Sequence, residues 1–315
     1  MKVVVIEPLD VEAGRLKEIE AEMLKHDAEV VYYPNRTTDV QELIGRGKDA
    51  DIVVVANQPL SAEVIDGFEK CKLLDVAFTG VDHIALDKCA EKGITVCNCA
   101  GYSTAAVSEL VFGMLISLYR NIAKCDTATR AGGTKDGLVG FELEGKKFGV
   151  IGTGAIGSRV AKVADAFGCE VYAYSRTVKD IPYIKYVSLE EVMSTCDIIS
   201  LHMPNNAQTK GMISRELIGL MKKDAVLINL ARGPVLDGDA LADALNEEKI
   251  AGACLDVFEV EPPLPTDHPL LTAKNTVVTP HVAFASKEAM VKRAYIVFDN
   301  IEKFVSGEPQ NLIQK

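Results

Sequence analysis

The feature that most constrains the fold is the glycine pattern G-x-G-x-x-G in Gly152-Thr153-Gly154-Ala155-Ile156-Gly157. The apolar run 147–151 precedes it, and a helical pattern follows from Ser158. A dinucleotide site needs this order of strand, tight turn and helix N-terminus, because the turn brings backbone amides to the pyrophosphate. Without that context, the same pattern would indicate only a glycine-rich turn. The residues predicted here to bind the coenzyme are Gly152, Gly154, Ala155, Ile156 and Gly157.

Short apolar segments alternate with helical segments along both halves of the 315 residues. This alternation is typical of βαβ units and parallel sheets. Strands are expected at 2–7, 29–33, 51–55, 72–78, 94–96, 147–151, 169–174, 197–201, 225–230, 250–255 and 276–279. Helices are expected at 11–25, near 39–46, from Ser61 as N-cap, at 103–120 and from about Ser286 to Val305.

The fold class expected is therefore α/β, with two doubly wound parallel-sheet domains and a cleft between them. The final helix is expected to return to the first domain. Residues 1–99 plus 285–315 would then form a flavodoxin-like substrate domain, and residues 100–284 a Rossmann coenzyme domain. Residues 121–145 contain five glycines and are expected to be an irregular loop, either functional or an interface arm.

The net charge of −11 argues against nucleic acid or an anionic membrane surface as the main partner. The longest apolar stretch, 110–118, is far shorter than the ~20 residues that span a membrane. The N-terminus becomes acidic too early for a signal peptide. Eight scattered cysteines show no metal-binding spacing, so we expect no metal and a reducing, cytoplasmic environment.

The segment after the second strand of the coenzyme domain indicates which coenzyme is bound. An NAD site normally has an acidic residue there, which accepts hydrogen bonds from the ribose. Here Ser175, Arg176 and Thr177 occupy that place, and they suit a 2′-phosphate. We therefore expect a preference for NADP. The alternative is that Arg176 is a solvated loop residue and NAD binds without the acidic contact.

Polar residues follow three of the apolar strands and suggest hydride-transfer chemistry. Reduction of a ketone needs a cation to hold the substrate and an acid to protonate the oxygen, and histidine suits the second role. Arg232 follows one strand, the segment from Asp256 to Glu261 carries three carboxylates after another, and His281 follows a third. Each alone would suit a cap or a surface charge, but the ends of parallel strands meet at one edge of a sheet. Together they favour catalysis.

The chain resembles the D-isomer-specific 2-hydroxyacid dehydrogenases over essentially its whole length. The resemblance is carried by the glycine motif, His202-Met203-Pro204 with Thr209, Asn229-Leu230-Ala231-Arg232-Gly233, Asp256-Val257-Phe258-Glu259-Val260-Glu261-Pro262 and Thr279-Pro280-His281. It implies reduction of a small 2-oxo acid to a D-2-hydroxy acid with NADP or NAD. It also implies a homodimer, and the glycine-rich arm is consistent with one.

The resemblance also assigns roles to individual residues. His281 would be the general acid/base, Glu261 its carboxylate partner, and Arg232 the residue that binds substrate carboxylate and carbonyl. Asp256 would hold the nicotinamide carboxamide. Glu259 and His202 would be supporting residues. The remaining coenzyme contacts implied are His202, Met203, Pro204, Thr209, Leu230 and Ala231.

In the first domain the resemblance places a substrate-carboxylate loop at Thr79-Gly80-Val81-Asp82, whose amides suit an anion. Asn57, after an earlier strand, would face the same cleft, although a turn-forming Asn before Gln58-Pro59 explains it equally well. Phosphoglycerate dehydrogenases of the family carry an arginine near this point, which the chain lacks in sequence. Formate dehydrogenases have Gln in place of Glu261.

A binding protein that senses the coenzyme, similar to corepressors related to the family, is the alternative of a different class. The catalytic triad does not separate the two, because such proteins can keep it. The absence of a basic patch or a disordered tail favours the enzyme. A nucleotide-binding domain without chemistry would require three strand-end residues to coincide by chance.

Overall fold

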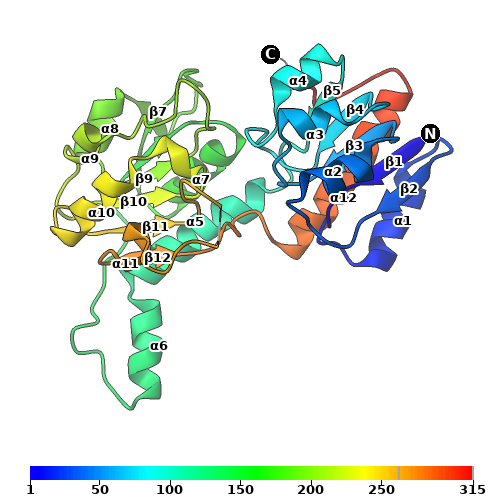
Figure 1. Ribbon diagram of the computed structural model, residues 1–315. Coiled ribbons are helices and arrows are strands. Elements are labelled where there is room, and N and C mark those ends of the chain that lie inside the picture. Colours follow the sequence, from blue (N-terminus) through cyan, green and yellow to red (C-terminus); the bar gives the residue numbers. More distant parts are fainter. Residues whose placement is uncertain (262, 314–315) are drawn as a thin grey trace. The chain divides into compact units, whose positions relative to one another are not determined.

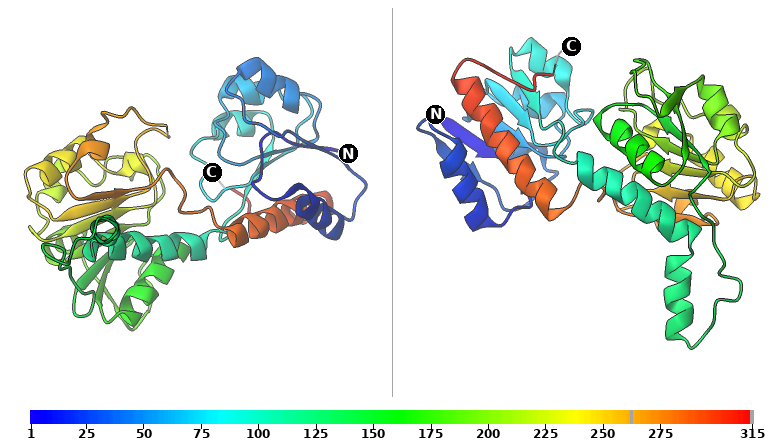
Figure 2. Two further views of the ribbon diagram at one scale, coloured as in Figure 1. Left: turned by 90° about the horizontal axis from the view of Figure 1, so that it is seen from below. Right: turned by 180° about the vertical axis from the view of Figure 1, so that it is seen from behind.

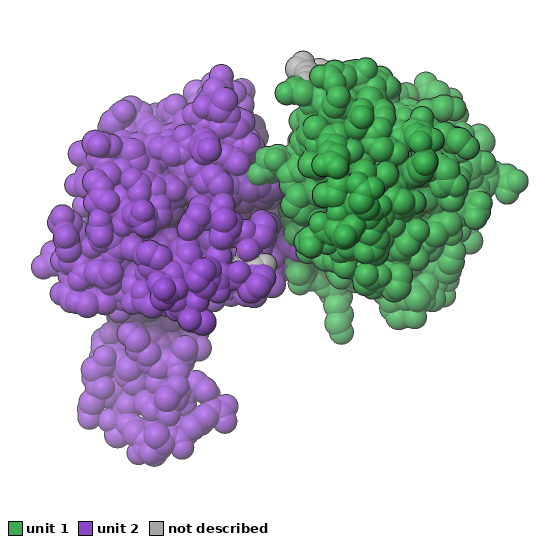
Figure 3. All heavy atoms as spheres, in the orientation of Figure 1, with its two compact units in different colours: residues 1–103, 285–315 green, residues 104–284 purple. Residues whose placement is uncertain are grey.

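The computed structural model describes residues 1–261 and 263–313. The chain divides into two compact units, shown in different colours in Figure 3. Unit 1 combines Met1–Ser103 with the segment from Ala285 onward, and unit 2 is Thr104–Phe284. Each unit is built around one parallel sheet, as the alternating pattern predicted (Figure 1).

The sheet of unit 1 has five parallel strands in the order β2-β1-β3-β4-β5, which is the flavodoxin-like order. The strands are β1 (Lys2–Val5), β2 (Glu29–Tyr32), β3 (Ile52–Val55), β4 (Leu73–Val76) and β5 (Thr95–Asn98). The central strand β3 reads Ile-Val-Val-Val and is buried along its whole length. Continuous apolar sequence is typical of a strand whose two faces are both covered by helices.

Five helices cover this sheet. They are α1 (Ala13–Met23), α2 (Val40–Gly47), α3 (Ala62–Asp66), α4 (Leu86–Glu91) and α12 (Lys287–Val305). The last of these returns from unit 2 and packs against α1 and β4 (Figure 2). Ser286 caps α12 by accepting a hydrogen bond from Ala289 N at 3.1 Å, and Ser61 caps α3 in the same way through Val64 N. Serine is well suited to this position because its hydroxyl satisfies an unpaired amide.

A buried carboxyl group lies beneath α12. Asp75 on β4 is fully buried, and its Oδ1 accepts a hydrogen bond from Asn300 Nδ2 at 3.0 Å. Among the described residues, its Oδ2 has no hydrogen-bond partner. Burial raises the pKa of Asp75 to about 7, and the single bond from Asn300 offsets this only in part. The site therefore favours the protonated carboxyl below neutral pH.

The sheet of unit 2 has seven parallel strands in the order β12-β11-β10-β9-β6-β7-β8. The strands are β6 (Lys147–Ile151), β7 (Glu170–Tyr174), β8 (Ile184–Tyr186), β9 (Ile198–Leu201), β10 (Val226–Asn229), β11 (Gly252–Leu255) and β12 (Thr276–Val278). From β8 to β11 this is the Rossmann order, extended by β12. The strand order reverses between β6 and β9, the position at which such sheets bind ligands.

Strand β8 was missed by the sequence analysis, which expected no strand between 174 and 197. It has three residues and lies at the sheet edge, so its apolar pattern is too short to stand out. It nevertheless supports the glycine turn. Tyr186 on β8 donates a hydrogen bond from its hydroxyl to Thr153 Oγ1 at 3.1 Å.

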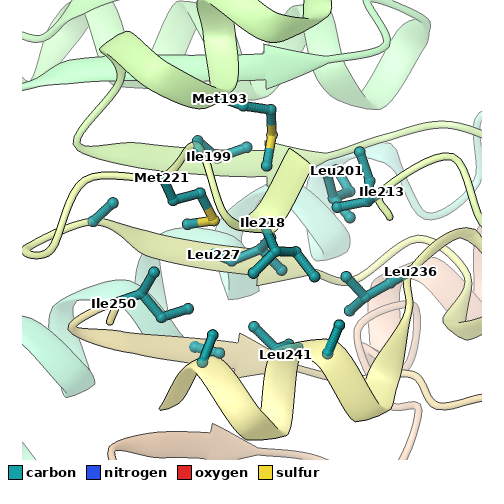
Figure 4. Close-up of a cluster of buried hydrophobic side chains, with 14 of the residues drawn as sticks. Met193, Ile199, Leu201, Ile213, Ile218, Met221, Leu227, Leu236, Leu241 and Ile250 are labelled. Atoms are coloured by element: carbon teal, nitrogen blue, oxygen red, sulfur yellow. The ribbon is translucent and has the colours of Figure 1, made fainter. Parts of the chain in front are cut away.

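Two apolar clusters enclose this sheet. Residues alternate between its faces, so that Ile199 and Leu227 belong to one cluster while Ile198 and Val226 belong to the other. Figure 4 shows the first cluster, which α8 (Leu189–Thr195), α9 (Arg215–Ile218) and α10 (Gly238–Asn246) complete. The second contains side chains from α5 (Thr104–Tyr119) and α7 (Ala155–Ala166). The remaining short elements of unit 2 are η1 (Gly233–Val235) and α11 (Pro269–Thr272).

The expectation of an irregular segment over 121–145 was wrong for its first part. Residues Ile122–Arg130 form helix α6, and only the later residues are irregular. All five glycines of the segment lie beyond residue 131, so they do not bear on α6. Its sequence also lacks an apolar stripe, and accordingly none of its residues is buried. Figures 1 and 2 show α6 projecting from the rest of unit 2.

No single described helix is long and apolar enough to cross a membrane. The bent pair α5 and α6, which meet at 55°, passes that test by length and composition when taken together. Helix α5 contributes buried side chains to the second apolar cluster of unit 2, including Val111 and Leu115.

Replacing Asp75 with Asn is expected to remove a pH dependence of stability. The folded-state pKa of about 7 lies above the unfolded value, so the wild-type protein loses stability as pH rises from about 4 to 7. The loss should be on the order of 2–4 kcal/mol. Urea unfolding at pH 4.5 and pH 8 should therefore show Asp75→Asn gaining stability over wild type at the higher pH. The exposed Asp27→Asn is the control, and equal pH dependence in all three proteins would contradict the account.

Candidate active site

The glycine motif forms the turn between β6 and α7. Gly152 has φ +98°, which disfavours any other residue, and its amide donates to Tyr174 O at 2.8 Å. A Cβ at Gly157 would lie 1.9 Å from Gly152 O, so helix and turn could not approach as they do. Gly154 is the N-cap of α7, and a Cβ there would meet no atom within 4 Å. The open helix start and close packing fit a dinucleotide pyrophosphate.

Arg176 lies just after β7, beside the glycine turn. Its Nη1 donates a hydrogen bond to Gln208 Oε1 at 2.9 Å. Ser175 is half-buried, whereas Arg176 and Thr177 are exposed. Further along the same loop, Lys179 Nζ donates to Ser158 Oγ on α7 at 3.1 Å. Two cations therefore lie on the loop after β7.

The loop after β9 carries Gln208 and is held by its own hydrogen bonds. Thr209 donates from Oγ1 to Pro204 O at 2.5 Å and accepts from Asn206 N at 3.0 Å. At its start, His202 Nε2 lies 2.8 Å from Ser200 Oγ, and burial lowers the pKa of His202 to about 4. The ring is therefore neutral at physiological pH. Met203 is buried at the same strand end.

Asp256, directly after β11, holds the turn that follows β12. Its Oδ1 accepts hydrogen bonds from Thr279 Oγ1 at 2.6 Å and Val282 N at 2.8 Å, and its Oδ2 accepts from Ala283 N at 2.8 Å. Its carboxylate is fully buried, and desolvation raises its pKa, although these three donors oppose the rise. The turn is thus closed around an internal anion.

His281 lies at the centre of that turn in a left-handed backbone conformation, with φ 54°. Such a conformation costs a residue other than glycine about 1–2 kcal/mol. His281 N donates to Asp256 O at 2.8 Å, and the carboxylate bonds on either side of it offset this cost.

The His281 ring pairs with Glu261. Nδ1 of His281 lies 2.7 Å from Glu261 Oε2. Because an ionised carboxylate can only accept, Nδ1 carries the proton, and Nε2 is the ring nitrogen that can accept a proton. The ring also meets Phe284 edge-on, with centroids 5.5 Å apart. The side chain of His281 is 10% exposed and that of Glu261 is 61% exposed, so the pair lies at the unit surface.

Arg232 follows β10, the neighbour of β11 in the sheet. The buried Asn229 shapes its turn by donating to Arg232 O at 2.9 Å and accepting from Ala231 N at 3.1 Å. Leu230, in the same turn, is buried. Arg232, Glu261 and His281 thus follow three adjacent strands, at the end of the sheet where the carboxyl ends of the strands lie. This placement was predicted from the parallel order of the strands.

In unit 1, Asn57 follows β3 and Thr79-Gly80-Val81 follow β4, the adjacent strand. A residue that the sequence analysis missed, Glu7, holds the first of these loops. It is buried, and its Oε1 accepts hydrogen bonds from Ala56 N at 2.7 Å and Gln58 N at 2.8 Å, the amides on either side of Asn57. Desolvation raises the pKa of Glu7 against these bonds.

An arginine lies near Asn57 in space although none lies near it in sequence. Arg36 Nε is 3.2 Å from Glu7 Oε2, and the Arg36 side chain is half exposed. The second loop is anchored separately, because Asn98 Nδ2 donates to Thr79 O at 2.7 Å. Glu7 lies two residues after the end of the apolar strand β1, and this position was the only sequence signal for it.

Within the described part of the chain, no group of three or more His, Cys, Asp or Glu side chains is placed to hold a metal ion. The eight cysteines are all free, and seven are buried.

Comparisons with known proteins identify the family of the chain. The family model for the NAD-binding domain of D-isomer-specific 2-hydroxyacid dehydrogenases matches residues 112–283. A hydroxypyruvate reductase of Blautia hydrogenotrophica is 35% identical over 299 residues, 91% of this chain and 92% of the relative. A D-3-phosphoglycerate dehydrogenase of Methanocaldococcus jannaschii is 40% identical over 275 residues, 85% of this chain and 52% of the relative.

Among solved structures, an acyclic imino acid reductase in complex with NADPH and D-Arg matches with a TM-score of 0.90 and 33% identity, covering 100% of both chains. The chain therefore belongs to the D-isomer-specific 2-hydroxyacid dehydrogenase family. It is an oxidoreductase that transfers hydride between a nicotinamide coenzyme and a 2-oxo acid. The relatives are enzymes, which does not favour the alternative of a corepressor-like binding protein.

Gly157→Ala is expected to disrupt the coenzyme turn. The added methyl would meet Gly152 O, and relieving such overpacking typically costs about 1–3 kcal/mol. Isothermal titration should show coenzyme affinity reduced by about tenfold, with a lower melting temperature. Gly45→Ala in α2 is the matched control, because its Cβ would meet nothing within 4 Å. Coenzyme affinity unchanged in Gly157→Ala would refute this account of the turn.

Proposed function

We propose that Arg232, Glu261 and His281 are the catalytic residues of this dehydrogenase. The observation that carries the proposal is the 2.7 Å contact between His281 Nδ1 and Glu261, made from a turn that Asp256 holds in a left-handed conformation. With Nδ1 engaged by Glu261, Nε2 is the nitrogen of His281 that exchanges a proton with the substrate. All three residues lie within the stretch 112–283 that matches the family model.

The residues divide the reaction between them. When bound, the reduced coenzyme supplies the hydride to the carbonyl carbon. Nε2 of the His281 imidazolium gives its proton to the carbonyl oxygen, so that the hydroxy acid forms and the ring becomes neutral. Glu261 stabilises the imidazolium before transfer. Arg232 holds the substrate carboxylate and polarises the carbonyl, a task suited to its forked donors.

We propose NADP as the preferred coenzyme, with NAD as the alternative. The loop after β7 has no acidic residue at 175–177, and Arg176 is oriented by Gln208. Lys179 adds a second cation on that loop. The solved imino acid reductase that this chain resembles is in complex with NADPH, which supports the same choice. Predicted coenzyme contacts also include Ala155, Ile156, Pro204 and Ala231.

The substrate we propose is a small 2-oxo acid of the glyoxylate or hydroxypyruvate type. Curated relatives named hydroxypyruvate reductase and glyoxylate reductase support this class. We propose that Asn57 and the loop Thr79-Gly80-Val81 bind its carboxylate end. Because Arg36 lies near Asn57, the substrate screen should include a 3-phosphorylated 2-oxo acid. The screen should also include a 2-imino acid, because a similar solved structure is that of an imino acid reductase.

We also propose that the protein is a homodimer and cytoplasmic. Helix α6 has no buried residue, and exposed apolar side chains lie at its start and in the segment after it: Ile122, Val139 and Phe141. A partner subunit would cover them. The eight free cysteines support a reducing compartment, as expected for the cytoplasm.

His281→Ala and Arg232→Ala are each expected to lower kcat by about 10²–10⁴-fold while coenzyme binding persists. Glu261→Gln should move the fall in kcat/KM for reduction to lower pH, because the imidazolium loses its anionic partner. Steady-state kinetics from pH 5 to 9 with coenzyme titrations would measure both effects. His26→Ala is the control, since that ring is exposed in unit 1. Wild-type rates in His281→Ala would rule out its role.

Arg176→Ala is expected to raise the KM for NADPH by about tenfold or more and to change the KM for NADH by less than about twofold. A hydrogen bond to a charged group is worth about 1.5–3 kcal/mol, and only NADPH would make it. Arg215→Ala, another exposed arginine of unit 2, is the control. A wild-type preference for NADH, or an unchanged coenzyme ratio in Arg176→Ala, would contradict the proposal.

A further inference from the structure

Unit 2 contains a second pair of a histidine and a carboxylate, and both of its residues lie within seven positions of Glu261 along the chain. Nε2 of His268 lies 2.7 Å from Glu259 Oε1. The His268 side chain is 8% exposed, whereas that of Glu259 is 56% exposed. A buried ring that reaches toward a carboxylate near Glu261 calls for an explanation.

The His268 ring is fixed on several sides. Its Nδ1 accepts a hydrogen bond from Leu270 N at 3.2 Å, which makes His268 the N-cap of α11. Nδ1 is therefore unprotonated, and Nε2 carries the hydrogen that it donates to Glu259. Phe258 packs against the ring edge-on, with centroids 5.6 Å apart. The donor atom is thus held in one place by helix and core.

Glu259 belongs to a segment that needs such support. Residues 256–261 follow β11 and contain no helix or strand, so no regular backbone ladder holds them. Two other contacts fix the start of the segment. Asp256 accepts hydrogen bonds from the turn around His281. The carbonyl oxygen of Phe258 packs so closely against Gly233 that a Cβ at Gly233 would lie 1.7 Å from it. Further along the segment, His268 forms a hydrogen bond with Glu259, two residues before Glu261.

We propose that His268 is a positioning residue which, through Glu259, holds Glu261 against His281. Glu261 is mostly exposed, so its own burial does little to fix it. Fastening the chain two residues earlier limits the positions that its carboxylate can reach. The proposal rests on the proposed catalytic role of Glu261 and His281. It predicts that breaking the contact between His268 and Glu259, which is remote from the reacting atoms, slows the proton transfer that Glu261 assists.

Two substitutions break the contact from opposite sides. His268→Asn keeps an N-cap side chain but is too short to reach Glu259 as histidine does. Glu259→Ala removes the partner from an exposed position, so the test stands even if the buried substitution lowers the yield of folded protein. His26→Asn is the matched control, because His26 forms a similar contact with Glu302 on the exposed surface of unit 1.

Both variants are expected to lower kcat by about tenfold, since small misplacements of catalytic groups have effects of this size or larger. Coenzyme affinity and the KM for the 2-oxo acid should change by less than about twofold. The pH profile of kcat/KM should move in the direction of Glu261→Gln. A purely structural loss would instead lower the fraction of active enzyme and leave the pH profile unchanged.

The decisive comparison is the double variant. In the Glu261→Gln background, His268→Asn should have almost no further effect on kcat, because the side chain it positions is already altered. Multiplicative losses in the double variant, or wild-type kcat in both single variants, would overturn the inference. If Glu261→Gln itself were fully active, the proposed catalytic pair would fail instead, so the two failures are distinguishable.

Discussion

The candidate active site depends on the buried carboxylate of Asp256. Its two oxygens accept three hydrogen bonds from the turn after β12, and that turn presents His281 in a left-handed conformation. Removing such a carboxylate from water is unfavourable, which is why its pKa is raised. The donors of the turn compensate, so carboxylate and turn stabilise one another. Neither would adopt its present arrangement alone.

The parallel sheet of unit 2 places the other proposed site residues at the same carboxyl end of the strands. Strands β10, β11 and β12 are neighbours, and each ends in a loop that carries one residue of the proposed catalytic set. On the other side of β9, strand β6 ends in the glycine turn of the coenzyme site. Because all the strands are parallel, their carboxyl ends share one edge. The proposed catalytic and coenzyme-binding residues therefore belong to one surface of this unit.

The sequence predicted the features that depend on local pattern. The glycine spacing predicted the β6–α7 turn, the alternation of apolar and helical segments predicted both sheets, and strand ends predicted where Arg232 and His281 lie. Helix α6 was missed because its sequence has no apolar stripe, and it accordingly buries no residue. Strand β8 was missed because three residues at a sheet edge carry too little signal.

Contacts between segments distant in the chain could not be predicted. Glu7 accepts from amides 49 and 51 residues away, and nothing in the local sequence pairs it with Asn57. The clasp of Asp256 on the turn around His281 spans 23 to 27 residues. The hydrogen bond from His268 to Glu259 joins residues that are nine positions apart in the sequence. Such contacts form only in the folded chain, where residues that are distant in the sequence lie side by side, so the local sequence pattern does not predict them.

The proposed role of Glu261 is to hold the His281 ring with Nδ1 protonated, so that Nε2 exchanges the proton with the substrate. Nitrogen-15 NMR of histidine-labelled protein measures this directly, with the His281 signals assigned by their loss in His281→Ala. At a pH where the ring is neutral, the account predicts the tautomer with hydrogen on Nδ1 in wild type. Finding the hydrogen on Nε2 instead would contradict it.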